Sequence, residues 1–157
     1  MPKQHRYKTI INWTGNKGAG TSGYRSYDRA HTIFVENKAP IYVSSDPAFM
    51  GDHSKYNPEE LLLASLSSCH MLWYLHLCSD NGVVVVAYED KATGTMEEDS
   101  SGSGKFTEVV LNPFVKVQHV SMMAKAKELH AEANKKCFIA NSCNFPVKHQ
   151  VLVEADD

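Results

Sequence analysis

The sequence predicts an α+β protein in which short strands accompany one long helix. Two observations predict this class. Segments with the alternating apolar pattern of strands lie on both sides of an apolar stretch, Leu61 to Cys78, that runs for 18 residues without a formal charge. A second helical pattern follows closer to the C-terminus, before a last strand. This order of strands, helix, strands, helix and strand is typical of the α+β class.

Length and composition indicate one domain over residues 1–157. The chain has 157 residues, a formal net charge of -2 and four cysteines. A chain of this length buries a core without metal or disulfide staples, and the balanced charge excludes a basic surface for nucleic acid or membrane. No apolar run typical of a secretion signal follows the first charged residues, so we expect a cytoplasmic protein. In that reducing compartment a functional cysteine is more often catalytic or redox-active than structural.

The segment before the long helix predicts an antiparallel meander. Alternating or β-branched residues mark three strands, at 5–13, 30–36 and 39–44. A glycine-rich loop, Gly15 to Gly23, separates the first two. Its Gly18 to Gly23 part matches a dinucleotide-binding string, but a strand follows instead of the helix that would hold a pyrophosphate. We therefore predict a surface loop and no nucleotide site.

Strong signals mark both ends of the long helix. Asn57 is an N-cap residue, Pro58 suits the first helical position, and Glu60 completes a capping box. Asn81-Gly82 supplies a left-handed stop. Serines and histidines interrupt the apolar run, which argues against a membrane span. We expect a central helix that is covered by sheet and by a second chain.

The rest of the chain predicts a second meander, a helix and a closing strand. The expected strands share β-branched or alternating residues and lie at 83–88, 91–97, 105–111, 114–120 and 147–155. The continuous β-branched run at 83–88 predicts a buried strand. Apolar positions from Met122 to Cys137 recur at spacings of three and four, which predicts one face of a helix. That face ends on Cys137.

Metal and hydrolase sites are not supported by the spacing of the candidate residues. A zinc cluster would have to use Cys69, His70, His76 and Cys78, but His70 and Cys78 point away from the other two on a helix. We expect no metal site, His70 and His76 as hydrogen-bonded core residues, and Cys78 as packing.

Cys69 and Cys137 are instead candidates for a redox dithiol. They are 68 positions apart and come from different helices, and Glu59 precedes Cys69 on the same helix, in a direction that differs by about 80°. Arg25 and Arg29 border the glycine loop, and a nearby arginine favours the reactive thiolate. On the residues alone, a redox pair and plain core cysteines both remain open.

The helix motif resembles a known family. Asn57-Pro58-Glu59-Glu60-Leu61-Leu62, with Ala64 and Ser68-Cys69 after it, is similar to the signature of the osmotically inducible protein C (OsmC) and organic hydroperoxide resistance (Ohr) family, in its OsmC-like branch. The segment 137–141 occupies the place of the second cysteine motif, with Phe138 where the family usually has proline.

The resemblance implies the OsmC-like fold, an intertwined homodimer and a thiol peroxidase without a cofactor. It implies Cys69 as the peroxidatic thiol, Cys137 as the resolving thiol and Glu59 as the carboxylate that orients an arginine, for which we favour Arg29 over Arg25. The expected partners are an organic hydroperoxide and an external dithiol reductant, with no nucleic acid or membrane. Cys143 is an alternative resolving thiol. The alternative function is a non-enzymatic dimer that binds a small ligand or serves as a structural stress protein.

Overall fold

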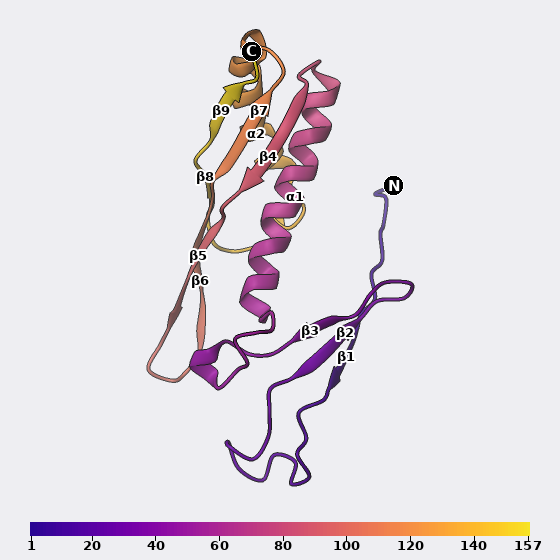
Figure 1. Cartoon of the computed structure of the whole chain (residues 1–157), viewed down its shortest axis with the longest axis vertical. Helices are drawn as coiled ribbons and strands as arrows, with labels where there is room; N and C mark the ends of the chain where they lie inside the picture. Colours follow the sequence, from indigo (N-terminus) through magenta and orange to yellow (C-terminus); the bar gives the residue numbers. More distant parts are fainter. The chain divides into compact units, whose positions relative to one another are not determined.

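The computed structural model describes residues 1–157, which form nine strands and two α-helices (Figure 1). The contacts divide the chain into two compact units, residues 1–61 and 62–157, which are described in turn. The single domain expected over 1–157 stays a prediction. The strands are β1 Ile10–Trp13, β2 His31–Phe34, β3 Ile41–Val43, β4 Val85–Asp90, β5 Thr93–Glu98, β6 Gly104–Leu111, β7 Pro113–Val117, β8 Val147–His149 and β9 Leu152–Ala155. The helices are α1 Pro58–Asp80 and α2 Met123–Lys136, and three short 3-10 turns lie at Pro47–Phe49, Val120–Met122 and Ala140–Ser142.

The first unit contains the predicted antiparallel meander, in the order β1-β2-β3. Trp13 pairs with His31, and His31 pairs in turn with Val43, so the register brings all three strands together at one end. The first strand is shorter than expected, because residues 5–9 form no strand. Every residue of β1 is exposed, since little else in this unit packs against the sheet.

The glycine loop is a turn-rich surface loop, as predicted. The side chain Oδ1 of Asn16 accepts hydrogen bonds from the backbone N–H groups of Gly18 (2.9 Å) and Gly20 (3.0 Å). Both glycines have positive φ, a conformation that side chains disfavour. No helix follows Gly23, so the loop lacks the helix N-terminus that a dinucleotide site requires.

The capping box of α1 is confirmed. The Glu60 N–H donates to Oδ1 of Asn57 (2.9 Å), and the Asn57 N–H donates to Oε2 of Glu60 (3.2 Å). At the other end, Gly82 has a φ of 68°, the left-handed conformation expected there. The helix ends at Asp80, two residues beyond the predicted limit.

Within its own chain α1 is buried along one stripe, formed by Leu66, His70, Tyr74 and Cys78 at spacings of four. The rest of the helix surface is partly or fully exposed, and Leu72 is 60% exposed. Its cover by a second chain stays a prediction. By length and composition alone α1 could cross a membrane, which is weak evidence because buried core helices meet the same criteria.

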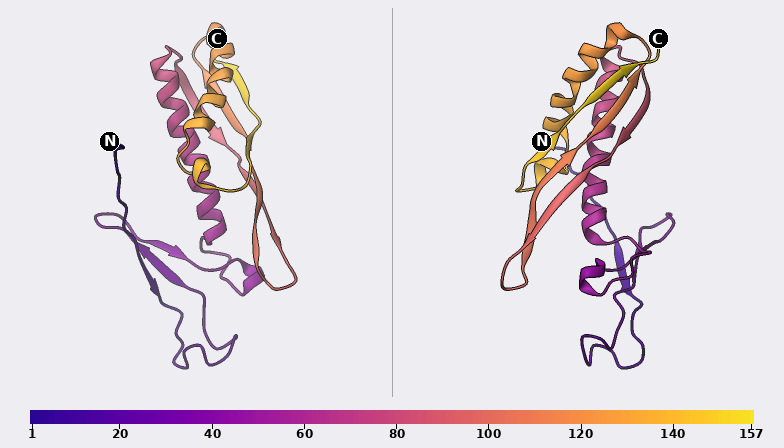
Figure 2. Two further views of the ribbon diagram at one scale, coloured as in Figure 1. Left: turned by 180° about the vertical axis from the view of Figure 1, so that it is seen from behind. Right: turned by 60° about the vertical axis from the view of Figure 1, so that its left-hand side comes forward.

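The second unit builds two three-stranded sheets, β4-β7-β9 and β5-β6-β8. The predicted strands and the β5-β6 hairpin are confirmed, with β4 pairing to β7 and β5 to β6 in antiparallel register. The expected closing strand at 147–155 is two strands, which pair in parallel with β6 and β7. The views in Figure 2 show β5 and β6 continuing away from the helices as a long ribbon.

The main core of this unit lies among α1, α2 and the β4-β7-β9 sheet. The predicted face of α2 is confirmed, since Ala126, Leu129, Ala133 and Cys137 are buried. The expectation that residues 83–88 are buried throughout is wrong, because Val84 and Val86 are exposed. A smaller core, with Leu66, Val109 and Leu111 at its centre, packs under the other sheet.

Candidate active site

The candidate site in the second unit is a pair of thiols. Cys69 lies on α1 and is partly exposed, whereas Cys137 caps the C-terminal end of α2 and is buried. The Cys69 thiol lies close enough to Cys137 to influence the pKa of the Cys137 thiol, and both thiols are free. The fold thus brings together two predicted site residues that are 68 positions apart in the sequence.

Burial raises the pKa of the Cys137 thiol to about 11, and the neighbouring Cys69 thiol adds to this rise. The backbone groups of Ala140 and Ile139 act in the opposite direction, and the N–H of Ala140 donates to Sγ of Cys137 at 3.4 Å. At neutral pH Cys137 is therefore a protonated thiol. In the pair, the partly exposed Cys69 is the thiol that an external molecule reaches first.

Aromatic side chains flank the two thiols. Trp73 follows Cys69 by one turn of α1, and Phe138 follows Cys137 directly. Their rings meet edge to face at 5.6 Å, and the ammonium group of Lys136 lies 5.3 Å from the centre of the Trp73 ring. Phe138 is 66% exposed. The chain close to both cysteines thus carries an aromatic pair, of which Phe138 is exposed to solvent.

The other two cysteines differ in environment. Cys78 is buried in the main core, as expected of a packing residue, and burial raises its pKa. Cys143 is partly buried and lies just beyond the segment 137–141. Its thiol donates to the carbonyl of Ile139 at 3.3 Å. Burial also raises the pKa of Cys143. Neither thiol is in contact with a cation that would stabilise its ionised form.

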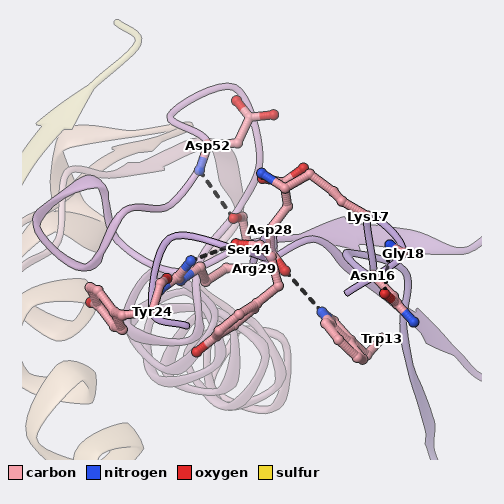
Figure 3. A network of polar contacts seen from close by, with 10 residues as sticks. Trp13, Asn16, Lys17, Gly18, Tyr24, Asp28, Arg29, Ser44 and Asp52 are labelled. Atoms are coloured by element: carbon pink, nitrogen blue, oxygen red, sulfur yellow. Dashed lines mark hydrogen bonds and ion pairs between the residues drawn. The ribbon is translucent and has the colours of Figure 1, made fainter. Parts of the chain in front are cut away.

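Arg29 and Glu59 belong to the first unit. The guanidinium group of Arg29 donates to the carbonyl oxygens of Tyr27 (2.6 Å) and Tyr24 (2.7 Å) and lies over both tyrosine rings, at 4.2 and 4.4 Å from their centres. Figure 3 shows this arginine inside the polar network that shapes the glycine loop. Arg25 is exposed, and the structure gives it no such anchorage. Arg29 is therefore the better-held arginine of the two.

A surface hollow of about 320 Å³ lies beside Arg29 in the first unit. Its lining residues include Asp28, Ser44, Asp52 and Lys55. The Asp52 N–H donates to Oγ of Ser44, and Nζ of Lys17 forms an ion pair with Asp28 at 3.2 Å.

Glu59 lies in the first turn of α1, and its Oε2 is buried without a hydrogen-bond partner in this chain. The roles of Arg29 and Glu59 toward the thiols stay predictions.

The two histidines of α1 have different surroundings. His70 is buried and bonded to His130, as expected of a core histidine. The same expectation is wrong for His76, which is exposed and pairs with Asp80 at 3.2 Å. Across the whole chain, no three His, Cys, Asp or Glu side chains converge in a way that would hold a metal ion.

Comparison with known proteins identifies the family. The family model described as OsmC-like protein matches residues 51–151. A curated but uncharacterized protein of Methanocaldococcus jannaschii is 32% identical over 100 residues, which are 64% of this chain and 51% of that protein. The chain thus spans about half the length of this relative.

Solved structures agree with this match along nearly the full chain. An OsmC-like protein of unknown function from Vibrio cholerae superposes with a TM-score of 0.85 and 29% identity, over 95% of this chain and all of the other. An organic hydroperoxide resistance protein from Elizabethkingia anophelis gives a TM-score of 0.71 at 15% identity, over 99% of this chain and 100% of the other. At that identity the second likeness shows the fold. The α+β chain described here belongs to the OsmC-like protein family.

Proposed function

We propose that this protein is a thiol-dependent peroxidase that reduces organic hydroperoxides. The observation that carries the proposal is the meeting of the Cys69 and Cys137 thiols, one accessible and one buried. Two neighbouring thiols suit an enzyme that cycles between a dithiol and a disulfide. Family membership supports the substrate class, since a relative of the same fold is named an organic hydroperoxide resistance protein.

The proposed reaction begins at Cys69. Its thiolate attacks the terminal oxygen of a hydroperoxide, the O–O bond breaks, and the alkoxide leaves with a proton as an alcohol. Cys69 is thereby oxidised to a sulfenic acid. The sulfur of Cys137 then attacks the sulfenic sulfur, which forms a disulfide and releases water. An external dithiol reduces this disulfide by exchange and is itself oxidised.

The surroundings of the two thiols support this division of roles. Because Cys137 is buried and protonated, it reacts only after a sulfenic acid has formed beside it. Cys69 is the thiol with access to solvent. The ring surface of Trp73 and Phe138 offers apolar contact to the organic part of a hydroperoxide, which favours such a substrate over hydrogen peroxide.

Arg29 and Glu59 complete the proposal. We assign Arg29 the role of stabilising the Cys69 thiolate, because a guanidinium near a thiol favours its ionised form. Glu59 would hold that guanidinium through a charge-assisted pair. Substituting Arg29 with Met should lower the rate of hydroperoxide reduction at least tenfold, whereas Arg25→Met should leave it unchanged. The reverse result would move the role to Arg25.

We also propose that the working form is a homodimer. Apolar side chains are exposed on both units: Ile10, Ile11, Trp13 and Ile41 on the first, and Leu72 on the second. A second copy would cover such surfaces, since monomers rarely leave apolar patches of this kind open. The dimer is a proposal and does not enter the chemistry of the two thiols.

The decisive experiment measures consumption of cumene hydroperoxide with a dithiol reductant. The wild type should turn over, and Cys69→Ser should fall to the uncatalysed rate. Cys78→Ser is the matched control, because Cys78 lies on the same helix but is buried in the main core. Equal rates for the wild type and Cys69→Ser would refute the proposed function.

Cys143 gives a second test of the resolving step. After one equivalent of hydroperoxide, peptide mapping of the wild type should find Cys69 linked to Cys137. A Cys69–Cys143 link would transfer the resolving role to Cys143, whose thiol lies in the segment that follows α2.

A further inference from the structure

A buried histidine pair joins the two helices that carry the thiols, and the proposed reaction does not use it. His70 of α1 is 1% exposed, and His130 of α2 is 0% exposed. Nε2 of His70 and Nδ1 of His130 lie 3.0 Å apart and share a hydrogen bond. Their rings are nearly parallel, with 11° between the planes. This is the one side-chain hydrogen bond between α1 and α2 in the chain.

The surroundings of the pair favour its neutral form. The ring of Tyr74 stacks on His130 at 3.8 Å, and the ring of His149, from β8, lies 5.8 Å from that of His70. On β4, Tyr88 packs against Tyr74, and Asp90 is already bonded to the hydroxyl of Ser67 and the N–H of Asn112. The other residues of this core, on β7, β9 and α2, are apolar.

No acceptor compensates for a proton added to the pair. Nδ1 of His70 and Nε2 of His130 are buried and have no hydrogen-bond partner. Burial lowers the pKa of His70 to about 4, with a further decrease from His149 and an opposing effect of Asp90. Burial also lowers the pKa of His130 to about 3, and His70 and His149 add to that decrease.

The pair lies next to the thiols along both helices. His70 directly follows Cys69, and His130 precedes Cys137 by seven residues, which is two turns on the same buried face of α2. A hydrogen bond at this point fixes the spacing of α1 and α2 close to where the thiols meet. Any change that separates the histidines also lets the end of α2 move away from Cys69.

We propose that the His70–His130 hydrogen bond positions Cys137 at Cys69, and that protonation of this pair loosens the dithiol. This inference rests on the Cys69–Cys137 disulfide of the proposed function. The histidines act here as positioning residues, since neither touches the reacting sulfur atoms. The consequence is a disulfide whose stability depends on pH even where no thiol titrates.

The direction of the pH effect follows from the linkage between protonation and structure. A histidine with a pKa below its ordinary value of 6.5 binds fewer protons in the closed arrangement than in an open one. The closed arrangement is therefore fully favoured above pH 6.5 and is progressively lost as the pH falls from there toward 4. Between pH 7 and pH 5 the reduced protein should open, and the disulfide should become easier to reduce.

A glutathione titration tests this directly. Oxidation by glutathione disulfide forms the Cys69–Cys137 bond and releases two molecules of glutathione, so two electrons pass from the protein dithiol to glutathione disulfide. With all thiols protonated this equilibrium constant is independent of pH, and an ionised Cys69 would make it rise on acidification. Measured anaerobically from both directions by mass spectrometry, the ratio of the constant at pH 7 to that at pH 5 should be about tenfold larger in the wild type than in His130→Asn, because the thiols are the same in both proteins.

Two variants separate positioning from packing. In His130→Asn a polar atom remains near the position of Nδ1, but residue 130 no longer titrates. The equilibrium constant of this variant at pH 7 should therefore stay within about threefold of the wild type, and at pH 5 it should be higher than that of the wild type. His130→Phe keeps a ring against Tyr74 but leaves Nε2 of His70 without a partner, so its constant at pH 7 should fall about tenfold. The exposed His119, changed to Asn, is the matched control and should behave as the wild type.

Three results would overturn the proposal. They are a ratio of the constants at the two pH values that is the same in the wild type and in His130→Asn, a His130→Phe constant equal to that of the wild type at pH 7, and the absence of a Cys69–Cys137 disulfide under all conditions. The last would also refute the proposed function. A pH-dependent disulfide in a protein that consumes no hydroperoxide would refute the proposed function alone. If His130→Asn does not fold, the constant of His130→Phe at pH 7 decides the matter.

Discussion

Nε2 of His70 and Nδ1 of His130 lie 3.0 Å apart inside the core of the second unit, with the ring of Tyr74 stacked on His130. The bond connects α1 to α2 across 60 positions of sequence. Each ring keeps one nitrogen without a partner, in a place that water does not reach. A core built in this way is stable while both histidines are neutral, and it opposes their protonation.

Folding stability should therefore decrease on acidification. The pKa of His70 falls to about 4 and that of His130 to about 3 in the folded chain, so both bind protons more readily in the unfolded chain. Their contribution is present above pH 6.5 and is lost as the pH falls toward 4. From pH 7 to pH 5 the free energy of unfolding should decrease on the order of 2 kcal/mol for each histidine. Urea unfolding at both pH values measures this change.

A control separates the pair from other histidines. In His130→Asn the loss of free energy between pH 7 and pH 5 should be clearly smaller than in the wild type. In His53→Asn, which alters a histidine of the first unit that is exposed, the loss should equal that of the wild type. An unchanged pH dependence in His130→Asn would show that other groups cause the acid sensitivity.

The capping box of α1 gives a prediction that is independent of the chemistry. Asn57→Ala removes the side-chain acceptor of the Glu60 N–H and should lower the free energy of unfolding by about 1 kcal/mol. Asn57→Asp keeps an acceptor at the same place and should cost little. Urea unfolding at neutral pH checks both, and equal losses for the two variants would mean that the cap contributes little to stability.

Assembly into a dimer is tested at Leu72. Within its own chain Leu72 on α1 is 60% exposed. Its large apolar side chain therefore contributes little hydrophobic stabilisation to the single chain. If a second copy covers it, Leu72→Glu should shift the protein toward the monomer in size-exclusion chromatography with light scattering. Ser79→Glu, at an exposed polar position of the same helix, should leave the mass unchanged. A monomeric wild type would refute the dimer.

Local signals were sufficient to predict most of the elements. The cap at Asn57 and the stop at Gly82 are chemical requirements of helix ends, so they place α1 to within two residues. The break of the closing strand at 150–151 was missed, because β-branched residues continue across it. There the chain changes partner from β6 to β7, which no local pattern records.

The thiol pair and the histidine pair differed in how far they could be predicted. The sequence marks Cys137 because it ends an apolar face of α2, whereas His130 lies on that same face among apolar neighbours that hide its role. Its spacing, four residues from Ala126 and seven from Cys137, was a usable signal. The partner of His130 could not be predicted, since contact between two helices depends on tertiary packing.

The intermediate of the proposed reaction is a sulfenic acid at Cys69. In Cys137→Ser the sulfenic acid formed at Cys69 has lost its resolving thiol, so one equivalent of cumene hydroperoxide should leave a form that dimedone traps. Mass spectrometry should place the adduct on Cys69 in this variant and find much less of it in the wild type, where Cys137 consumes the sulfenic acid. Cys69→Ser should give no adduct. Equal trapping in the wild type and Cys137→Ser would mean that Cys137 does not resolve the intermediate, whatever its closeness to Cys69.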